Sequence, residues 1–253
     1  MPQNKNVVYT AIFGDYEGLV PQRPQTGFDY VCFTDNPNLK AKPWNINVCT
    51  PPVKNDPTRA NRHVKILVHQ YLWEYENSVF IDGNFLIIGD MSKLIEKYLA
   101  NQSMAAFSHT ETSDPRDCLY SEYEALIKIG EKTGNYRDDP EIMAAQIKRY
   151  REEGYPQHRG LIKGGVLLRK HSSAKMIQVM EDWWKEIEKG SKRDQLSFNY
   201  AAWKNDFTYE TIPGDIRRGN PYAYWLGKHR KNWSLKILKT RLKLFVNPIK
   251  KAN

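Results

Sequence analysis

The stretch VFIDGNF, residues 79–85, decides the fold of this chain. Its apolar residues predict a short buried strand that ends where an acid and an amide, Asp82 and Asn84, stand two residues apart. A D-G dipeptide usually marks an ordinary tight turn. The same two side chains also offer the hard oxygen ligands that a divalent cation takes, with diphosphate oxygens completing its shell. On this stretch alone, both interpretations stay open.

Predicted strands and helices alternate outward from this stretch. The alternation predicts a single α/β domain, with a mostly parallel sheet and helices on both faces, over residues 1–231. A basic tail follows at 232–253, and no linker is long enough to separate a second domain. The predicted strands are 7–14, 28–33, 78–81 resumed at 85–88, 104–107 and 160–168; the predicted helices are 57–75, 90–99, 121–132, 139–153, 173–189 and 193–203.

Composition excludes several classes of protein. An apolar fraction of 40% is that of a globular chain, and no run reaches the roughly 20 apolar residues that a membrane-spanning helix needs. Residues 1–6 are polar, so we expect no secretory signal. The three cysteines form no C-x-x-C pair, which argues against a disulfide framework or a zinc knuckle. We therefore expect a cytoplasmic protein.

The net charge of +9 is concentrated near the C-terminal end. Of the 38 Lys and Arg residues, nine lie in residues 228–253, which contain no acid. The rest of the chain therefore holds 29 basic and 29 acidic residues. A nucleic-acid enzyme more often spreads its basic residues over the folded body, so we expect no nucleic-acid partner.

The predicted helix before the central stretch carries a row of basic side chains. They follow one another at spacings of three, three and four, within one sector of about 120°. Such a face beside a diphosphate would neutralise the charge that develops on a leaving nucleotide. The alternative is a solvated helix face, although no acid interrupts the row before Glu74. The row consists of Arg59, Arg62, Lys65 and His69.

The order of these segments resembles the donor site of retaining glycosyltransferases with the GT-A fold, a Rossmann-like α/β fold. In those enzymes a basic helix leads into an acidic D-x-D strand and then a further helix, as residues 59–94 do here. More closely, the chain is similar to a glycosyltransferase family with plant and bacterial members that was first catalogued as a domain of unknown function. The resemblance covers about residues 6–231, and the matching pieces are YTAIFGDY at 9–16, FTD at 33–35, IDGN at 81–84, SHTETSDPR at 108–116 and RDQLSF at 193–198. GLIKGGVLL at 160–168 is similar to a later strand of the retaining GT-A enzymes.

The resemblance implies a role for each matching residue. Asp82, Asn84 and His229 would hold Mn²⁺ or Mg²⁺. Two departures bear on this metal site, since Asn84 replaces a second aspartate and the segment around His229 lacks the usual His-x-x-Gly-x-x-Lys order. Asp194 and Lys163 are the catalytic candidates, with Asp194 beside the donor sugar and the acceptor hydroxyl. The donor nucleotide sugar would contact Thr10, Ala11, Phe13, Tyr16, Asp35, Arg59, Arg62, Lys65, Asp82, Gly164 and Gly165.

Three features leave alternatives open. Asp194 also starts a predicted helix, where a carboxylate would cap backbone N–H groups. Gly164 and Gly165 would let a sugar approach the backbone, or else only break a strand. A contact with acceptor or donor, or else a satisfied polar cluster, would be formed by His109, Arg116 and Glu122.

These implications predict a metal-assisted hexosyltransferase. It would move a hexose-type unit, with retention of configuration, from a UDP-linked nucleoside diphosphate sugar to a glycan or lipid-linked acceptor. In such chemistry the leaving diphosphate itself takes the acceptor proton, so the main work is positioning and stabilising that diphosphate. Two alternatives are a metal-dependent hydrolase of a lipid amide and a catalytically inactive binder of nucleotide sugar or glycan, the latter suggested by Asn84.

The basic tail predicts an amphipathic helix. From Leu235, apolar residues recur at 235, 238, 242, 245, 246 and 249, on one stripe of about 100° that basic residues flank. Pro248 is expected to end or kink the helix near Val246. The stripe would lie in an anionic membrane interface and make the protein peripheral on the inner face of a membrane, or it would pack onto the domain. Both interpretations stay open.

Overall fold

The computed structural model describes residues 4–171, 173–217 and 219–246. Its strands are β1 (Asn6–Ile12), β2 (Phe28–Thr34), β3 (Asn45–Val48), β4 (Asn77–Ile81), β5 (Phe85–Ile87), β6 (Met104–Ser108), β7 (Ile162–Lys170), β8 (Glu210–Ile212) and β9 (Ala223–Trp225). Its helices are α1 (Pro57–Ile66), α2 (Val68–Tyr71), α3 (Met91–Tyr98), α4 (Leu119–Thr133), α5 (Pro140–Glu152), α6 (Ala174–Lys189), α7 (Phe198–Lys204) and α8 (Ser234–Val246), with short 3-10 turns η1 (His109–Glu111) and η2 (Asp194–Leu196).

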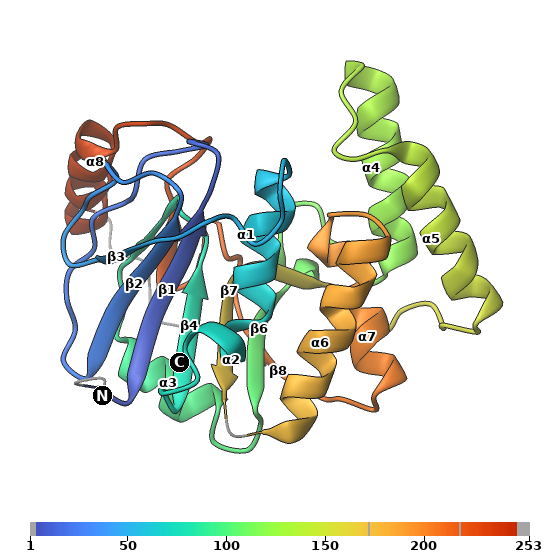
Figure 1. The fold of residues 1–253 in the computed structure, drawn as a ribbon, viewed down its shortest axis with the longest axis horizontal. Coiled ribbons are helices and arrows are strands. Elements are labelled where there is room, and N and C mark those ends of the chain that lie inside the picture. The colour runs from blue at the N-terminus through green and yellow to red at the C-terminus, as the bar shows by residue number, and fades with distance from the viewer. Residues whose placement is uncertain (1–3, 172, 218, 247–253) are drawn as a thin grey trace.

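A seven-stranded sheet in the order β3-β2-β1-β4-β7-β6-β8 forms the centre of the molecule (Figure 1). The first four strands in this order run parallel to one another, and β6 runs parallel to β8. Strand β7 is antiparallel to both of its neighbours, β4 and β6. The predicted mostly parallel α/β sheet is therefore confirmed, with one reversed strand at its middle.

Helices cover both faces of this sheet, as predicted. Successive side chains of β1 point to opposite faces, so Val7 and Tyr9 enter one core and Val8 enters the other. Helices α1 and α6 pack on each other over the first core. Helix α3 and the small antiparallel sheet of β5 and β9 enclose the second. After its first residue, each of β1 and β4 is therefore buried along its whole length, and most of its residues are apolar.

Two groups of helices lie beyond the ends of the sheet (Figure 1). On one side α4, α5 and α7 enclose a separate core in which the rings of Tyr150 and Tyr200 stack at 3.7 Å. At the opposite end α8 is held by Trp233, whose Nε1 donates to the carbonyl of Gly18 at 2.5 Å, and by the buried Ile237. Among the described helices, none has the length and apolar character needed to cross a membrane.

Most predicted elements are confirmed to within a few residues, but the basic helix is shorter than predicted. Leu67, with φ −88° and ψ 40°, leaves the helical conformation, so α1 ends at Ile66 and α2 is a separate turn. The inclusion of His69 in the basic row was therefore wrong, because His69 lies on α2. Similarly, the helix predicted at 193–203 is divided into η2 and α7. The edge strands β3 and β8 were not predicted, since their mostly exposed residues carry no apolar pattern.

Candidate active site

Several of the predicted site residues meet at one edge of the sheet. Because β1, β2 and β4 are parallel, their carboxyl ends share an edge, the upper edge in Figure 1. The strand order reverses between β1 and β4, since β2 and β3 lie on one side of β1 and the later strands on the other. In open α/β sheets, ligands bind outside the carboxyl ends at such a switch point. The loop after β1 and Asp82 after β4 stand at this position.

The turn at residues 82–84 is tied down on both sides. The backbone N–H of Asp82 donates to the carbonyl of Gly165 at 2.9 Å, which leaves the half-buried carboxylate at the end of β4. Asn84 is buried, and its Nδ2 donates to the carbonyl of Gly227 at 2.9 Å. Asn84 thus connects this turn to the late segment that carries His229. Its role as a metal ligand stays a prediction.

Glu17 is a site residue that the sequence analysis missed. Its buried carboxylate lies 2.7 Å from Nδ1 of His229. A Cβ added to Gly83 would collide with Glu17 Oε1, so the carboxylate packs directly on the 82–84 turn. Burial raises the pKa of Glu17 and the charge of Asp82 adds to this rise, although His229 opposes it. The available signal was position alone, since Glu17 immediately follows the matching YTAIFGDY segment.

Asp82 and His229 fit a divalent cation whose remaining ligands come from the bound substrate. Because Glu17 engages Nδ1 of His229, Nε2 is the ring nitrogen left to ligate, which is the usual carboxylate–histidine–metal arrangement. Asp82 offers a carboxylate, and Mg²⁺ commonly takes one or two carboxylates together with water and phosphate. In the part of the chain that the structure describes, no three His, Cys, Asp or Glu side chains converge closely enough to hold a metal by themselves. Oxygens from a bound diphosphate would be needed to complete the shell.

Asp194 forms a buried ion pair with Lys65. Its Oδ2 lies 2.5 Å from the Lys65 Nζ and 3.4 Å from Nε of Arg62. Burial alone would raise the pKa of Asp194, but the charges of Arg62 and Lys65 outweigh it and hold that pKa below its usual range. Asp194 is therefore an anion and a weak base. The interpretation of Asp194 as a helix cap was wrong, since its Oδ1 accepts only from the N–H of the adjacent Gln195 and η2 has no side-chain cap.

The glycine pair makes room for side chains on both faces of β7. A Cβ at Gly164 would lie 2.9 Å from Nζ of Lys65 and 3.1 Å from Oδ2 of Asp194. A Cβ at Gly165 would lie 3.1 Å from the Phe85 ring and 3.3 Å from Oδ2 of Asp82. The pair therefore brings Asp194 and Asp82 to neighbouring positions on opposite faces of one strand. Strand β7 continues through both glycines, so they do not break it.

The other predicted donor contacts are divided between the surface and the interior. Tyr16 is 63% exposed, and its ring lies 4.4 Å from that of His229. Asp35 accepts from the N–H of Gly14 and so holds the loop after β1. Arg59 is engaged by protein groups, since it pairs with Asp56 at 2.7 Å and donates to carbonyls at the end of α6. Fully buried positions are occupied by Thr10, Ala11 and Phe13.

Comparison with known proteins assigns this arrangement to a family. Residues 1–212 match the family described as TOD1/MUCI70, glycosyltransferase-like domain. The chain belongs to this family. Over 172 residues it is 23% identical to the probable hexosyltransferase MUCI70 of Arabidopsis thaliana, and the match covers 64% of this chain and 28% of that protein. The chain thus spans under a third of the length of this curated relative.

Solved glycosyltransferase structures show a loose likeness. The apo structure of the bifunctional glycosyltransferase WbbM has a TM-score of 0.48 at 13% identity, covering 96% of this chain and 45% of that one. The glycosyltransferase GlyE of Streptococcus pneumoniae TIGR4 has a TM-score of 0.47 at 12% identity, covering 98% of this chain and 52% of that one. The glycosyltransferase family that the sequence motifs indicated is confirmed by the match over residues 1–212.

In this member of the TOD1/MUCI70 family, a polar cluster follows β6. His109 is buried, with Nε2 3.0 Å from Arg116 and 3.6 Å from a carboxylate oxygen of Glu122. Arg116 donates to the same oxygen of Glu122 at 2.8 Å. Burial and the charge of Lys163 lower the pKa of His109 to about 4. Of the two alternatives for His109, Arg116 and Glu122, a substrate contact or a satisfied polar cluster, the structure therefore shows the polar cluster. Lys163 lies beside this cluster.

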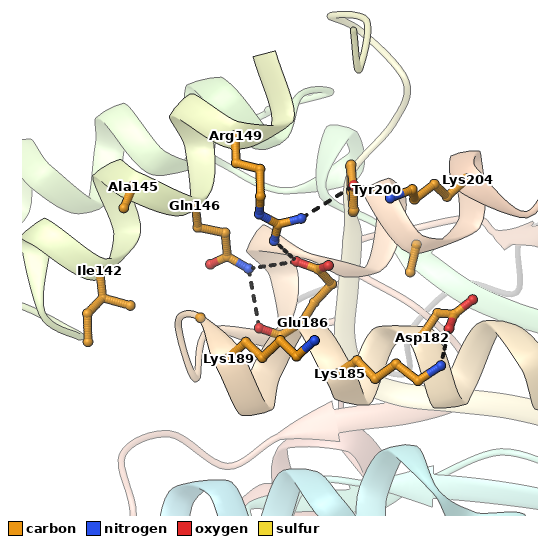
Figure 2. A pocket seen from close by; sticks show the side chains of 12 residues that line it. Ile142, Ala145, Gln146, Arg149, Asp182, Lys185, Glu186, Lys189, Tyr200 and Lys204 are labelled. Atoms are coloured by element: carbon orange, nitrogen blue, oxygen red, sulfur yellow. Dashed lines mark hydrogen bonds and ion pairs between the residues drawn. The ribbon is translucent and has the colours of Figure 1, made fainter. Parts of the chain in front are cut away.

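A hollow of about 680 Å³ lies elsewhere, between α5, α6 and α7 (Figure 2). Both acids that line it are already paired, Glu186 with Arg149 and Asp182 with Lys185. None of the predicted site residues lines it. Because it holds, among the described residues, neither a predicted site residue nor a free carboxylate, the hollow does not compete with the sheet edge as the candidate active site, despite its size.

Proposed function

We propose that this protein is a metal-assisted, retaining hexosyltransferase. It takes a hexose-type unit from a UDP-linked sugar and transfers it to a glycan or lipid-linked acceptor. The observation that carries the proposal is the convergence, at the β1/β4 switch point, of Asp82, the Glu17–His229 pair and the Lys65–Asp194 pair. Membership of a glycosyltransferase-like family supports the class of reaction.

Each group has a part in this chemistry. Asp82 and Nε2 of His229 would hold Mn²⁺ or Mg²⁺ against the diphosphate, and the cation would offset the charge that develops on the leaving group. Arg62, which reaches the same edge, adds a fixed positive charge. Tyr16, exposed beside His229, offers an aromatic face to the nucleotide.

The transfer itself needs no strong base. The bond between the anomeric carbon and the diphosphate oxygen breaks, and the acceptor oxygen bonds to the anomeric carbon on the same face. The acceptor proton passes to the leaving diphosphate oxygen. Because Asp194 stays ionised, it is suited to stabilise positive charge at the anomeric carbon rather than to remove a proton.

UDP release from a panel of UDP-sugars, with Mn²⁺ or with chelator, tests the proposal. We expect metal-dependent release from at least one donor, and a loss of roughly 100-fold or more in Asp82→Asn, which keeps the shape of the side chain. Asp182→Asn, at a partly exposed position on α6 that lies outside the candidate site, should retain the wild-type rate. Hydrolysis of a lipid amide without any nucleotide requirement would support the hydrolase instead. UDP binding without release from any donor would support the inactive binder.

We further propose that α8 binds an anionic membrane surface from the cytoplasmic side. Helix α8 packs on the domain through Ile237 and Thr240, which are buried. The predicted apolar stripe points the other way, so the alternative in which the stripe packs onto the domain was wrong. Its described members are all at least 57% exposed: Leu235, Leu238, Leu242, Phe245 and Val246. The predicted continuation at Pro248, Ile249 and Lys250 lies outside the described residues.

The charge around this exposed stripe supports an anionic bilayer as its partner. Lysines 236, 239 and 243 flank it on one side and Arg241 on the other, and residues 228–253 hold no acid. An apolar stripe bordered by basic residues matches the headgroup region of an anionic bilayer, where each basic residue contributes about 1 kcal/mol. A lipid-linked acceptor would lie in the same surface.

Co-sedimentation with vesicles of phosphatidylcholine containing phosphatidylserine tests the membrane proposal. The full chain should sediment at low salt, and Leu238→Glu with Leu242→Glu should abolish sedimentation without lowering the melting temperature, because both positions are exposed. Ile129→Glu, an exposed apolar site on α4, is the matched control and should sediment normally. If the wild-type chain stays in the supernatant, or dimerises through α8 in sedimentation velocity, membrane binding is refuted.

A further inference from the structure

Three cations gather beside the active site without a matching number of acids. Lys163 on β7 pairs across the sheet with Phe107, so its side chain stands on the same face as that ring. Arg217 follows the buried Ile216, which packs against Gly165 on this face. Arg193 comes from the segment before η2 and reaches Glu122 at 3.9 Å.

The acid available to this cationic trio of Lys163, Arg193 and Arg217 is already engaged. Glu122 is bound by Arg116 at 2.8 Å, closer than its 3.9 Å approach to Arg193. Within the described residues, neither the Lys163 ammonium nor the Arg217 guanidinium forms an ion pair or a side-chain hydrogen bond. The Arg193 Nε is buried and has no partner there either.

Such an arrangement is unfavourable in the free protein. Like charges repel, and the partial burial of Lys163 removes water that would otherwise solvate its ammonium. Burial and the charge of Arg217 lower the pKa of Lys163 to about 8, which reports this strain on the ammonium. An anion bound between the three groups would relieve it, and charge-assisted hydrogen bonds from two guanidinium groups would fix its orientation.

The position of the trio indicates where in the substrate that anion lies. Lys163 is two residues from Gly165 on the same strand, a separation of about 6.6–6.8 Å along β7. Gly165 in turn is next to Oδ2 of Asp82. A group held by the trio is therefore displaced from a diphosphate at Asp82 by roughly the width of one sugar ring. Arg217 also lies over the ring of Trp225 at 5.0 Å, a cation–π contact that holds its guanidinium in place.

We propose that Lys163, Arg193 and Arg217 bind the carboxylate of an acidic sugar, so that the substrate of this enzyme contains a uronate-type unit. The assignment rests on the proposed transferase function, because it places the carboxylate relative to the bound donor. The uronate is either the transferred sugar or the acceptor unit next to it. Both sources share one chemistry, a carboxylate on a pyranose ring.

Matched acidic and neutral probes separate these sources. UDP-glucuronate and UDP-glucose are compared as donors by UDP release, and a uronate oligosaccharide and its carboxyl-reduced form are compared as ligands by calorimetry. We expect the acidic member of one pair to be preferred by roughly tenfold or more. Arg217→Gln, at an exposed position, and Arg193→Gln should each remove the preference, while Arg151→Gln on α5 should keep it.

The result also tells this inference apart from the proposed function. UDP release that is metal-dependent but equal for both members of each pair would overturn the acidic-sugar assignment and leave the transferase standing. If Arg217→Gln instead weakens binding of UDP itself, the trio holds the diphosphate and the assignment is overturned. If no donor releases UDP but the acidic oligosaccharide is still preferred, the proposed transferase function is refuted and the proposed carboxylate site is supported.

Discussion

Two lysines stand on opposite faces of β7 and show how differently one residue type can be used. Lys65, behind Gly164, is 1% exposed and pairs with Asp194 at 2.5 Å. Lys163, on the face of Phe107, stands among arginines and has no carboxylate of its own among the described residues. The first charge is neutralised inside the protein, whereas the second is left for a ligand to neutralise.

The difference predicts which lysine supports the fold and which serves the substrate. A buried pair with its partner in place contributes little net stability, but removing one member leaves an uncompensated charge. A cation without a partner has little to lose when it is removed. The two sites should therefore respond in opposite ways to the same substitutions.

The largest expected effect comes from breaking the buried pair. Asp194→Asn should lower the free energy of unfolding by about 3–5 kcal/mol, because it leaves Lys65 buried without its anion. Urea denaturation at neutral pH measures this loss. Activity should also fall, since the anion at the active-site edge is gone.

A double variant separates stability from catalysis. Lys65→Met with Asp194→Leu replaces the pair by apolar groups and should recover most of the lost stability, without recovering UDP release. Recovery of both would show that Asp194 is structural only. A stability loss in the double variant equal to that of Asp194→Asn would contradict the buried-pair argument.

A smaller loss is expected from Gly164→Ala. The new Cβ would lie 2.9 Å from Nζ of Lys65, so the pair has to shift, at a cost of about 1–3 kcal/mol. Gly219→Ala is the matched control, since a Cβ there meets no atom within 4 Å. Equal melting temperatures of the two variants would mean that the Lys65–Asp194 pair can shift without lowering the stability of the protein.

The pH dependence of binding sharpens the comparison on the other face. Lys163 is charged below its pKa of about 8 and neutral above it. The surrounding groups are Arg116, Arg193, Arg217, Glu122 and His109; guanidinium groups do not titrate in this range, and the pKa of His109 is about 4. Affinity for the acidic probe should therefore fall by about tenfold from pH 7 to pH 9. Lys163→Arg should give a flat profile in the same calorimetric series, and a wild-type profile without this fall would exclude Lys163 from binding.

The smallest effect is expected for the stability of Lys163→Met. Because the ammonium is repelled by its neighbours and leaves no partner behind, the free energy of unfolding should fall by no more than about 0.5 kcal/mol. Lys65→Met, measured beside it, should lose several times as much. Similar losses at both positions would show that Lys163 has a structural partner, and the contrast between the two faces would fail.

Local patterns predicted much of the fold and part of the site. The apolar run that stops at Asp82, the Asp90 and Asp139 caps and the Trp-rich helix after Ser173 are short-range features, and each element appears where they indicate. The position of Asp82 at the end of its strand followed from the apolar run before it. By contrast, Arg59 shares the spacing of Arg62 and Lys65 but bonds to Asp56 and the end of α6. Spacing on a helix could not distinguish them, because their partners lie more than 120 residues away.

The sequence by itself determined the α/β class, the position of Asp82 and the concentration of basic charge near the C-terminal end. These properties depend on residue order over a few turns or strands, and short-range sterics and hydrophobic periodicity express them directly. Only the tertiary structure decided that Glu17 meets His229, that Lys65 meets Asp194, and that the stripe on α8 faces outward. Each of these depends on which distant segment fills the neighbouring space, and long-range packing, not local pattern, selects that segment.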